Sequence, residues 1–184
     1  MMVLENACEF KEYLSSVFDE MGFYGSFEVV GKNINLNIAP KDNNDLPTKK
    51  QVLEKLTETA LKKKKQELES QINAICKEKI VKEFRSSVLG SLHAYDLELE
   101  DQFNLQALVT AGVDSVFRCA EVDDGVALNK TYKNHTKAQI LKLSQETLKF
   151  KQNIIIFYGR EKERLNAINS LEALEKFVIK EYWT

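Results

Sequence analysis

The sequence has little proline, glycine, cysteine or histidine. It contains 2 prolines and 7 glycines among 184 residues, so breaks in regular structure should be confined to a few positions. Its 3 cysteines, Cys8, Cys76 and Cys119, are widely spaced and odd in number, without a CxxC pair. This spacing favours free, reduced thiols over a disulfide framework. Neither the cysteines nor the 2 histidines have the spacing of metal ligands, and we therefore expect no metal ion and no other cofactor.

A strong charge of one sign and a long apolar run are also absent. The 26 basic and 28 acidic residues give a formal net charge of −2, which creates no overall field for nucleic acid or anionic lipid. The longest apolar run, residues 154–158, is far too short to span a membrane. Residues 1–10 lack the basic segment of a signal peptide. We expect neither nucleic acid nor a membrane as a partner.

Local patterns divide the chain into three segments of an α+β protein. Residues 1–46 should form a helix and a β-hairpin, because apolar residues first recur at helical spacing and Gly31-Lys32 then joins two strand-like runs. Residues 47–83 should form one long connecting helix. Residues 84–184 should form a compact domain in which a small antiparallel sheet packs with three helices.

The long helix should exceed the length that a small domain can bury. About 35 residues extend for about 50 Å at about 1.5 Å per residue. The helix should begin at the capping box of Thr48 and Gln51. Leu61, Leu68 and Ile75 recur every seven residues, a spacing typical of coiled coils. We therefore interpret these three residues as a candidate oligomer seam.

The stretch from Phe84 to Gly112 should reverse the chain. Gly90 lies between strand-like runs at 88–89 and 92–95, so we predict a tight hairpin with a positive φ at Gly90. The apolar residues that follow have mostly helical spacing up to Gly112, a typical residue for a helix end.

Turn and capping signals predict the rest of the compact domain. A second hairpin should turn at residues 123–125, where two aspartates precede a glycine. The Thr136 and Gln139 capping box should open a helix that continues to about residue 168. A last helix over 171–182 should be capped by Asn169.

Three groups of residues in the reversing stretch could carry chemistry. The acids Glu98, Glu100 and Asp101 could supply the two carboxylates of a hydrolase, but acidic residues at a helix start also interact favourably with the helix dipole. His93 and Tyr95 alternate on a predicted strand and should face one side, where they could line a pocket or satisfy neighbouring polar groups. The amides of Gln102 and Asn104 are suited to locking a helix onto a hairpin. We favour the structural interpretation for all three groups.

Several short motifs along the chain can be compared with those of known protein families. They comprise Phe84-x-Ser86-Ser87-x-Leu89-Gly90-x-x-His93-x-Tyr95-Asp96, Glu100-Asp101-Gln102-x-Asn104-Leu105, Ala111-Gly112, Phe117-Arg118-Cys119, His135-Thr136 with Gln139, and Asn169-Ser170-Leu171-Glu172-x-Leu174. On these residues the chain resembles an uncharacterised domain family of bacteriophage and prophage tail proteins. The resemblance covers about residues 61–179 and leaves residues 1–50 unmatched.

The resemblance implies a non-enzymatic structural or assembly component of the tail fibre or baseplate region, with other phage tail proteins as partners. It brings no established catalytic residues. The symmetry of tail fibres makes a trimer the favoured homo-oligomer through the long helix. The expected location is the host cytoplasm during assembly, with the virion tail as a second location. Two alternatives stay open, a chaperone for tail fibre assembly and a hydrolase of cell-wall or surface glycans.

We expect the matched residues of the reversing stretch to serve the architecture. These motif residues are Phe84, Gly90, His93, Tyr95, Asp96, Asp101, Gln102, Asn104 and Leu105.

Overall fold

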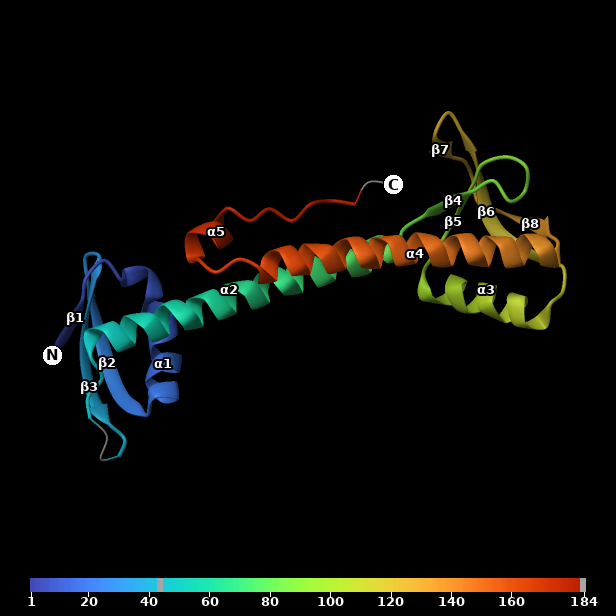
Figure 1. Ribbon diagram of the computed structural model, residues 1–184. Helices are drawn as coiled ribbons and strands as arrows, with labels where there is room; N and C mark the ends of the chain where they lie inside the picture. The colour runs from blue at the N-terminus through green and yellow to red at the C-terminus, as the bar shows by residue number, and fades with distance from the viewer. Residues whose placement is uncertain (43–44, 183–184) are drawn as a thin grey trace. The chain divides into compact units, whose positions relative to one another are not determined.

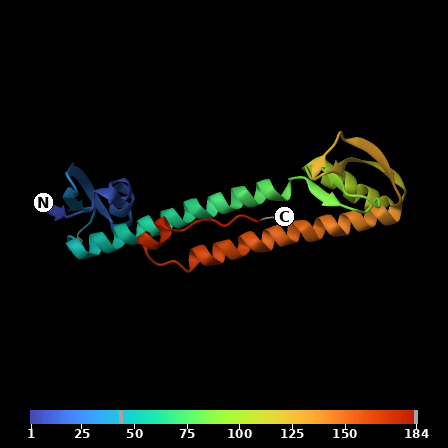
Figure 2. The same ribbon diagram turned by 90° about the horizontal axis from the view of Figure 1, so that it is seen from above.

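The computed structural model describes residues 1–42 and 45–182, and it divides into two compact units (Figures 1 and 2). The first unit comprises Met1–Glu69 and Arg164–Val178, and the second comprises Ser70–Glu163 and the chain from Ile179 onward. Helices together with antiparallel sheets confirm the predicted α+β class. The boundary between the units falls within the helices α2 (Lys49–Ile80) and α4 (Lys137–Asn166), so each of these helices contributes to both units. The predicted boundaries, after residues 46 and 83, lay outside both helices.

The first unit contains a three-stranded antiparallel sheet in the order β1-β3-β2. Its strands are β1 (Met2–Leu4), β2 (Phe23–Val30) and β3 (Asn33–Pro40). The predicted hairpin is confirmed, with Val30 opposite Asn33 and Gly31 at a φ of 62°. Because Gly31 has a positive φ and Lys32 does not, the turn meets the requirement of type II′.

The core of the first unit lies between this sheet and its helices. The 3₁₀ helix η1 (Cys8–Tyr13) leads into α1 (Leu14–Met21), which ends at Gly22 with a φ of 77°. Helix α1 and the first turns of α2 pack against the sheet (Figures 1 and 2). The buried side chains are Leu4, Ala7, Leu14, Val17, Phe18, Ile34, Leu36, Val52 and Leu56. All of them are apolar, so burial of hydrocarbon is the main source of stability here.

The second unit is built around a five-stranded antiparallel sheet. Its path is β4-β5-β6-β7, and β8 pairs with β6 as well. The strands are β4 (Phe84–Ser86), β5 (His93–Tyr95), β6 (Ser115–Asp123), β7 (Val126–Ala127) and β8 (Thr131–His135). Helix α3 (Leu99–Ala111) and α4 contribute to one core with the sheet, through Leu105, Ile140 and Leu143.

The turn at Gly90 differs from the predicted tight hairpin. Strand β4 ends at Ser86, which pairs with His93, so the connection is longer than predicted. A β-turn closes within it, because the Gly90 amide donates to the Ser87 carbonyl at 2.9 Å, and Gly90 has the predicted positive φ, 98°. Val88 is buried in the core instead of pairing in a strand, since its side chain is held by the apolar cluster.

The last helix is shorter than predicted. Helix α5 spans only Leu171–Glu175, and its N-cap is Ser170, whose hydroxyl accepts from the Ala173 amide at 3.3 Å, in place of Asn169. Further along, the Lys180 amide donates to the Glu161 carboxylate at 3.0 Å. Backbone groups beyond α5 are thus satisfied by side chains of α4, which replaces the helical bonds that the sequence pattern suggested.

Candidate functional site

The motif residues of the second unit meet in a buried aromatic cluster. The Tyr95 hydroxyl lies 3.0 Å from Nε2 of His135, and Nδ1 of His135 lies 2.9 Å from the Lys133 carbonyl. Since a carbonyl can only accept, Nδ1 carries the proton and Nε2 accepts from the tyrosine. Burial raises the pKa of Tyr95 and lowers the pKa of His135, so both groups are held in their neutral forms. The pair is enclosed in the core and satisfies its own hydrogen bonds.

His93 and Tyr95 lie on the same side of β5, as their alternation predicted. Both are buried, and Nδ1 of His93 lies 2.9 Å from the Ser91 carbonyl. Phe84 pairs with Tyr95 across the strands, and its ring stacks at an angle on Phe150 with centroids 5.2 Å apart. These contacts give the aromatic motif residues a packing role.

Polar motif residues tie α3 and the strands to α4. Gln102 donates to the Leu97 carbonyl at 2.6 Å and accepts a short hydrogen bond from Lys151 of α4. Ser86 donates to the Glu146 carboxylate of α4 at 2.6 Å. The Gln102 amide therefore ties α3 to the segment before it and to α4, whereas the prediction was that it locks the helix onto a hairpin.

Two further motif residues make contacts of other kinds. Asp96 forms a salt bridge of 2.5 Å with Lys130, and Leu105 is buried in the core. Asn104 is exposed on α3. The network of motif residues thus includes residues from β4, β5 and α3 but does not include Asn104.

The acidic residues do not form a pair of opposed carboxylates. Glu98 is the N-cap of α3, and Glu100 and Asp101 follow in its first turn. Asp101 borders a cavity of about 330 Å³ that Arg118 and Tyr132 also line. Asp101 is the one acidic residue among the lining side chains, whereas glycoside hydrolysis uses two carboxyl groups across the scissile bond.

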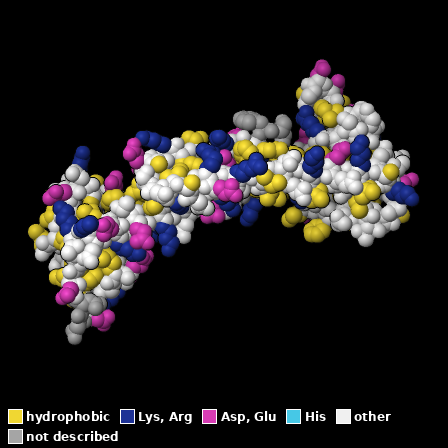
Figure 3. All heavy atoms as spheres, viewed as in Figure 1, with side chains coloured by type: hydrophobic (Ala, Val, Ile, Leu, Met, Phe, Trp, Pro, Cys, Tyr) yellow, Lys and Arg dark blue, Asp and Glu magenta, His cyan; other side chains and the backbone are white. Residues whose placement is uncertain are grey.

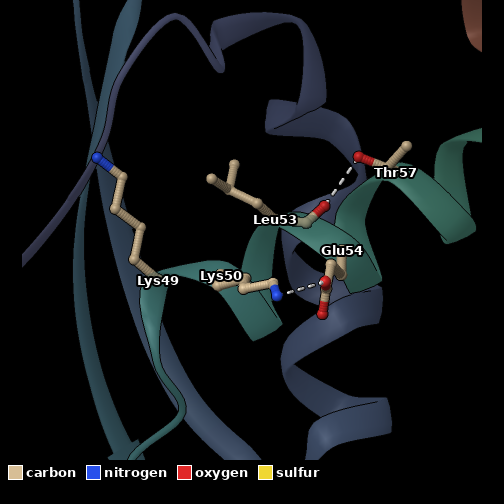
Figure 4. Close-up of a pocket in the computed structure, with 5 residues that line it drawn as sticks. All are labelled: Lys49, Lys50, Leu53, Glu54 and Thr57. Carbon is tan, nitrogen blue, oxygen red and sulfur yellow. Dashed lines mark hydrogen bonds and ion pairs between the residues drawn. The ribbon is translucent and has the colours of Figure 1, made fainter.

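Another cavity lies on the first turns of α2. It measures about 630 Å³ and is lined by Lys49, Lys50, Leu53, Glu54 and Thr57, shown in Figure 4. Within it, Lys50 and Glu54 form an ion pair at 3.8 Å and the Thr57 hydroxyl donates to the Leu53 carbonyl at 2.8 Å. The described residues that line it all belong to α2, so the cavity is an open surface beside this helix.

An exposed apolar stripe follows α4 within the second unit. Leu141, Leu148 and Ile155 are 48%, 57% and 51% exposed and recur every seven residues. Ala138 precedes Leu141 by three residues, Gln145 and Gln152 lie between the apolar residues at spacings of four and three, and all three are exposed as well. We call these six residues the α4 stripe. Figure 3 shows hydrophobic side chains on the surface over α4.

The α4 stripe lies on a different side of α4 from the buried face. Ile140, Leu143 and Ile154 belong to the buried face, and Leu141 and Ile155, next to Ile140 and Ile154 in the sequence, are exposed. Helix α3 adds exposed Leu99 and Phe103 to the same unit. Apolar side chains are also visible over α3 in Figure 3. The seven-residue spacing of Leu141, Leu148 and Ile155 is a sequence signal of this second face.

The predicted seam on α2 is less accessible than the α4 stripe. Leu68 is only 9% exposed, and Leu61 and Ile75 are half-buried. Pairing of α2 with another chain through these residues stays a prediction.

Neither a membrane span nor a metal cluster is found in the described residues. Within residues 1–42 and 45–182, every helix is too short or too polar to cross a membrane. In the same part of the chain, His, Cys, Asp and Glu side chains do not gather in groups of three that could hold a metal ion. Cys8 and Cys76 are half-buried and Cys119 is buried, and all three are free.

No protein-family model, curated protein or solved structure matches the chain. The resemblance to phage tail proteins therefore depends on the short residue matches quoted above.

Proposed function

We propose that the chain is a non-enzymatic structural or assembly component of a bacteriophage or prophage tail, in the fibre or baseplate region, and that it binds a helix of another tail protein along α4. The observation that carries the proposal is the α4 stripe, with Leu141, Leu148 and Ile155 exposed at coiled-coil spacing. Apolar side chains that recur along one exposed helix face are typical of a surface that binds another helix. Full burial of a leucine or isoleucine side chain is worth about 1.5–3 kcal/mol, and covering the half-exposed side chains of this stripe contributes roughly half of that for each.

The internal bonding of the motif residues supports a role without catalysis. Tyr95 pairs with His135, Ser86 pairs with Glu146, and Gln102 joins α3 to α4. These matched residues are used to build the second unit, which leaves the outer face of α4 as the surface that this architecture presents. In this proposal, the residues that resemble tail proteins build the fold, and the binding surface lies on α4.

The charges beside the α4 stripe indicate the kind of partner. In the heptad of the stripe, Lys142 and Lys149 lie on one side, and Lys137 and Lys151 lie on the other. Within the chain, Lys142 already pairs with Glu146 at 3.9 Å and Lys151 donates to Gln102, so the flanks keep a basic character that is partly neutralised on each side. A parallel pair of α4 helices would place Lys137 of one copy against Lys142 of the other, which is repulsive. The matching partner is an amphipathic helix with apolar residues at spacings of three and four and with acidic residues on its flanks.

Co-purification with the other tail proteins of the same particle tests the proposal. A tagged full-length chain should retain a tail protein that contains such an acidic amphipathic helix, and a peptide of that helix should bind the chain directly. Leu148→Glu should weaken the binding of the peptide at least tenfold, because a charge is buried in the seam. Asn153→Glu adds the same charge to an exposed position of α4 outside the stripe and should leave binding unchanged.

The location of the chain after assembly separates a structural component from a chaperone. A structural component should be found in purified particles, whereas a chaperone should accompany its partner before assembly and be absent from particles. Equal binding of the peptide to wild type and Leu148→Glu would overturn the assignment of the α4 stripe.

A further inference from the structure

The two outer strands of the sheet in the first unit are the short β1 and the long β2, and the longer open edge runs along β2. Strand β2 pairs with β3 over its whole length of 8 residues, and its other side has no strand partner among the described residues. Sheets commonly protect such an edge with lysine, proline, a bulge or a very short strand. The sequence Phe23–Val30 contains neither lysine nor proline, its pairing with β3 runs without a bulge, and Glu28 is its one charged residue.

The hairpin determines which backbone groups of β2 point outward. In a hairpin with a two-residue turn, the residues next to the turn form a hydrogen-bonded pair, here Val30 and Asn33. Every second residue back from Val30 therefore bonds to β3. The bond from the Lys41 amide to the Gly22 carbonyl, 2.9 Å, continues this alternation. The amide and carbonyl groups that point away from β3 belong to Phe23, Gly25, Phe27 and Val29.

Pro40 provides an independent check of this assignment. It lies opposite Phe23, in a pair that the alternation leaves without hydrogen bonds between the two strands. Proline has no amide hydrogen, so it fits a position of this kind and would break a bonded pair.

We propose that β2 pairs antiparallel with β2 of a second copy of this chain, with Ser26 opposite Ser26. This register places Phe23 opposite Val29 and Gly25 opposite Phe27, so that every outward backbone group finds a partner. A register centred on Phe27 would instead set Phe23 against the turn residue Gly31. The pairing joins the two sheets of β1, β2 and β3 into one continuous sheet.

Charge and shape of the side chains agree with the same register. Glu28 lies opposite Tyr24 of the second copy, and the two copies of Glu28 stay apart, which avoids a like-charge pair. On the core face, Phe27 of each copy lies beside Gly25 of the other. The ring of Phe18 occupies the space next to Gly25, where a Cβ atom would lie 2.6 Å from the ring. Phe27 and Val29 are both 40% exposed in the single chain and would be covered by the pairing.

Cross-linking tests the register directly. In the proposed pairing, the two copies of residue 26 form a pair without hydrogen bonds, whose Cα atoms approach to about 4.5 Å, within the range of a disulfide. Ser26→Cys in the full chain should give a covalent dimer on mild oxidation. Glu28→Cys and the parent chain, which carry the same native cysteines, should stay uncross-linked, because residue 28 faces residue 24 of the other copy. Absence of the Ser26→Cys dimer, or equal cross-linking through Glu28→Cys, would overturn the register.

Mass measurements test the dimer itself. The full chain should sediment as a dimer at high micromolar concentration. Val29→Pro removes an outward amide without breaking a bond to β3 and should shift the chain to a monomer, whereas Val29→Ala should remain dimeric. Leu148→Glu on the α4 stripe should leave the dimer intact, so this result is independent of the proposed function. A monomeric parent chain, or a dimer that Val29→Pro does not affect, would overturn the proposal.

Discussion

The two units bury different kinds of side chains. The core of the first unit is apolar, and Thr59 is its one buried polar residue among the described residues. The second unit buries Ser86, His93, His135, Thr147 and Glu161 in addition to its apolar core. Ser86, His135 and Glu161 bond to residues distant in the sequence, so they specify which elements come together, whereas the buried Thr147 hydroxyl has no hydrogen-bond partner among the described residues. The first unit should therefore tolerate the replacement of one buried apolar side chain by another of similar size. The second unit depends on particular pairs of hydrogen-bonded residues.

The sheets differ in a corresponding way. In the second unit, β6 is paired with β5, β7 and β8 along different parts of its length. In the first unit, β2 keeps a long open edge. The unit with the simpler core thus presents backbone groups for pairing, and the unit with the polar core presents an apolar helix face. The same chain offers two chemically distinct surfaces, which should act independently.

The largest effect should come from removing apolar volume in either core. We expect Leu105→Ala to cost about 2–5 kcal/mol, as truncation of a buried leucine does, and Leu36→Ala in the first unit to cost a similar amount. Urea unfolding monitored by circular dichroism measures both values. A cost below about 1 kcal/mol for Leu105→Ala would mean that α3 is not docked through this residue.

Removing one hydroxyl group should distinguish the two units. Tyr95→Phe leaves Nε2 of His135 buried without its donor, which should cost about 1–3 kcal/mol. Tyr24→Phe, made in the monomeric Val29→Pro chain so that the proposed pairing of β2 does not contribute, removes the same group from an exposed residue of the first unit and should change stability by less than about 0.5 kcal/mol. Equal costs in the same unfolding assay would contradict the structural role assigned to the Tyr95–His135 pair.

Acid should weaken the second unit through His135. Burial lowers the pKa of this imidazole in the folded state, whereas in the unfolded chain it is about 6.5. The unfolded chain therefore binds more protons between these two values, and stability falls as the pH drops below about 6.5. Above that pH the contribution is fully present. Unfolding at pH 7.5 and 5.5 should show this loss, and His135→Gln should reduce the difference between the two values.

Local sequence signals predicted several elements of both units. The capping box at Thr48 is confirmed by bonds of 2.8 Å and 3.3 Å with Gln51, and the box at Thr136 and Gln139 has the same bonds. The turn at Gly31 is confirmed as well. These features depend on residues within a few positions of each other, which is why spacing and residue type suffice.

Features that depend on distant residues could not be read in this way. Strand β1 forms only because β3 offers it a free edge, and residues 1–6 carry no strand pattern of their own. Apolar residues occur on two sides of α4, so the sequence pattern does not say which side is buried. Ile154 is buried and Ile155 is exposed because other elements cover only one side of the helix. Of the predicted motif site, the pairing of Tyr95 with His135 joins residues 40 positions apart and was not predicted.

The smallest effect should come from the acidic residues at the start of α3. Glu100 is exposed in the first turn, where its charge interacts with the helix dipole. Such an interaction is weak, so Glu100→Gln should lower the melting temperature by less than about 4 °C. Gly90→Val tests the neighbouring turn: its φ of 98° strains any residue with a Cβ atom, although the space around it is open, so we expect a larger decrease. If Glu100→Gln instead left the melting temperature unchanged and abolished cleavage of a cell-wall or surface glycan, the acidic turn would be a catalytic site. The second unit would then be an enzyme domain, and its polar residues would not serve the architecture alone.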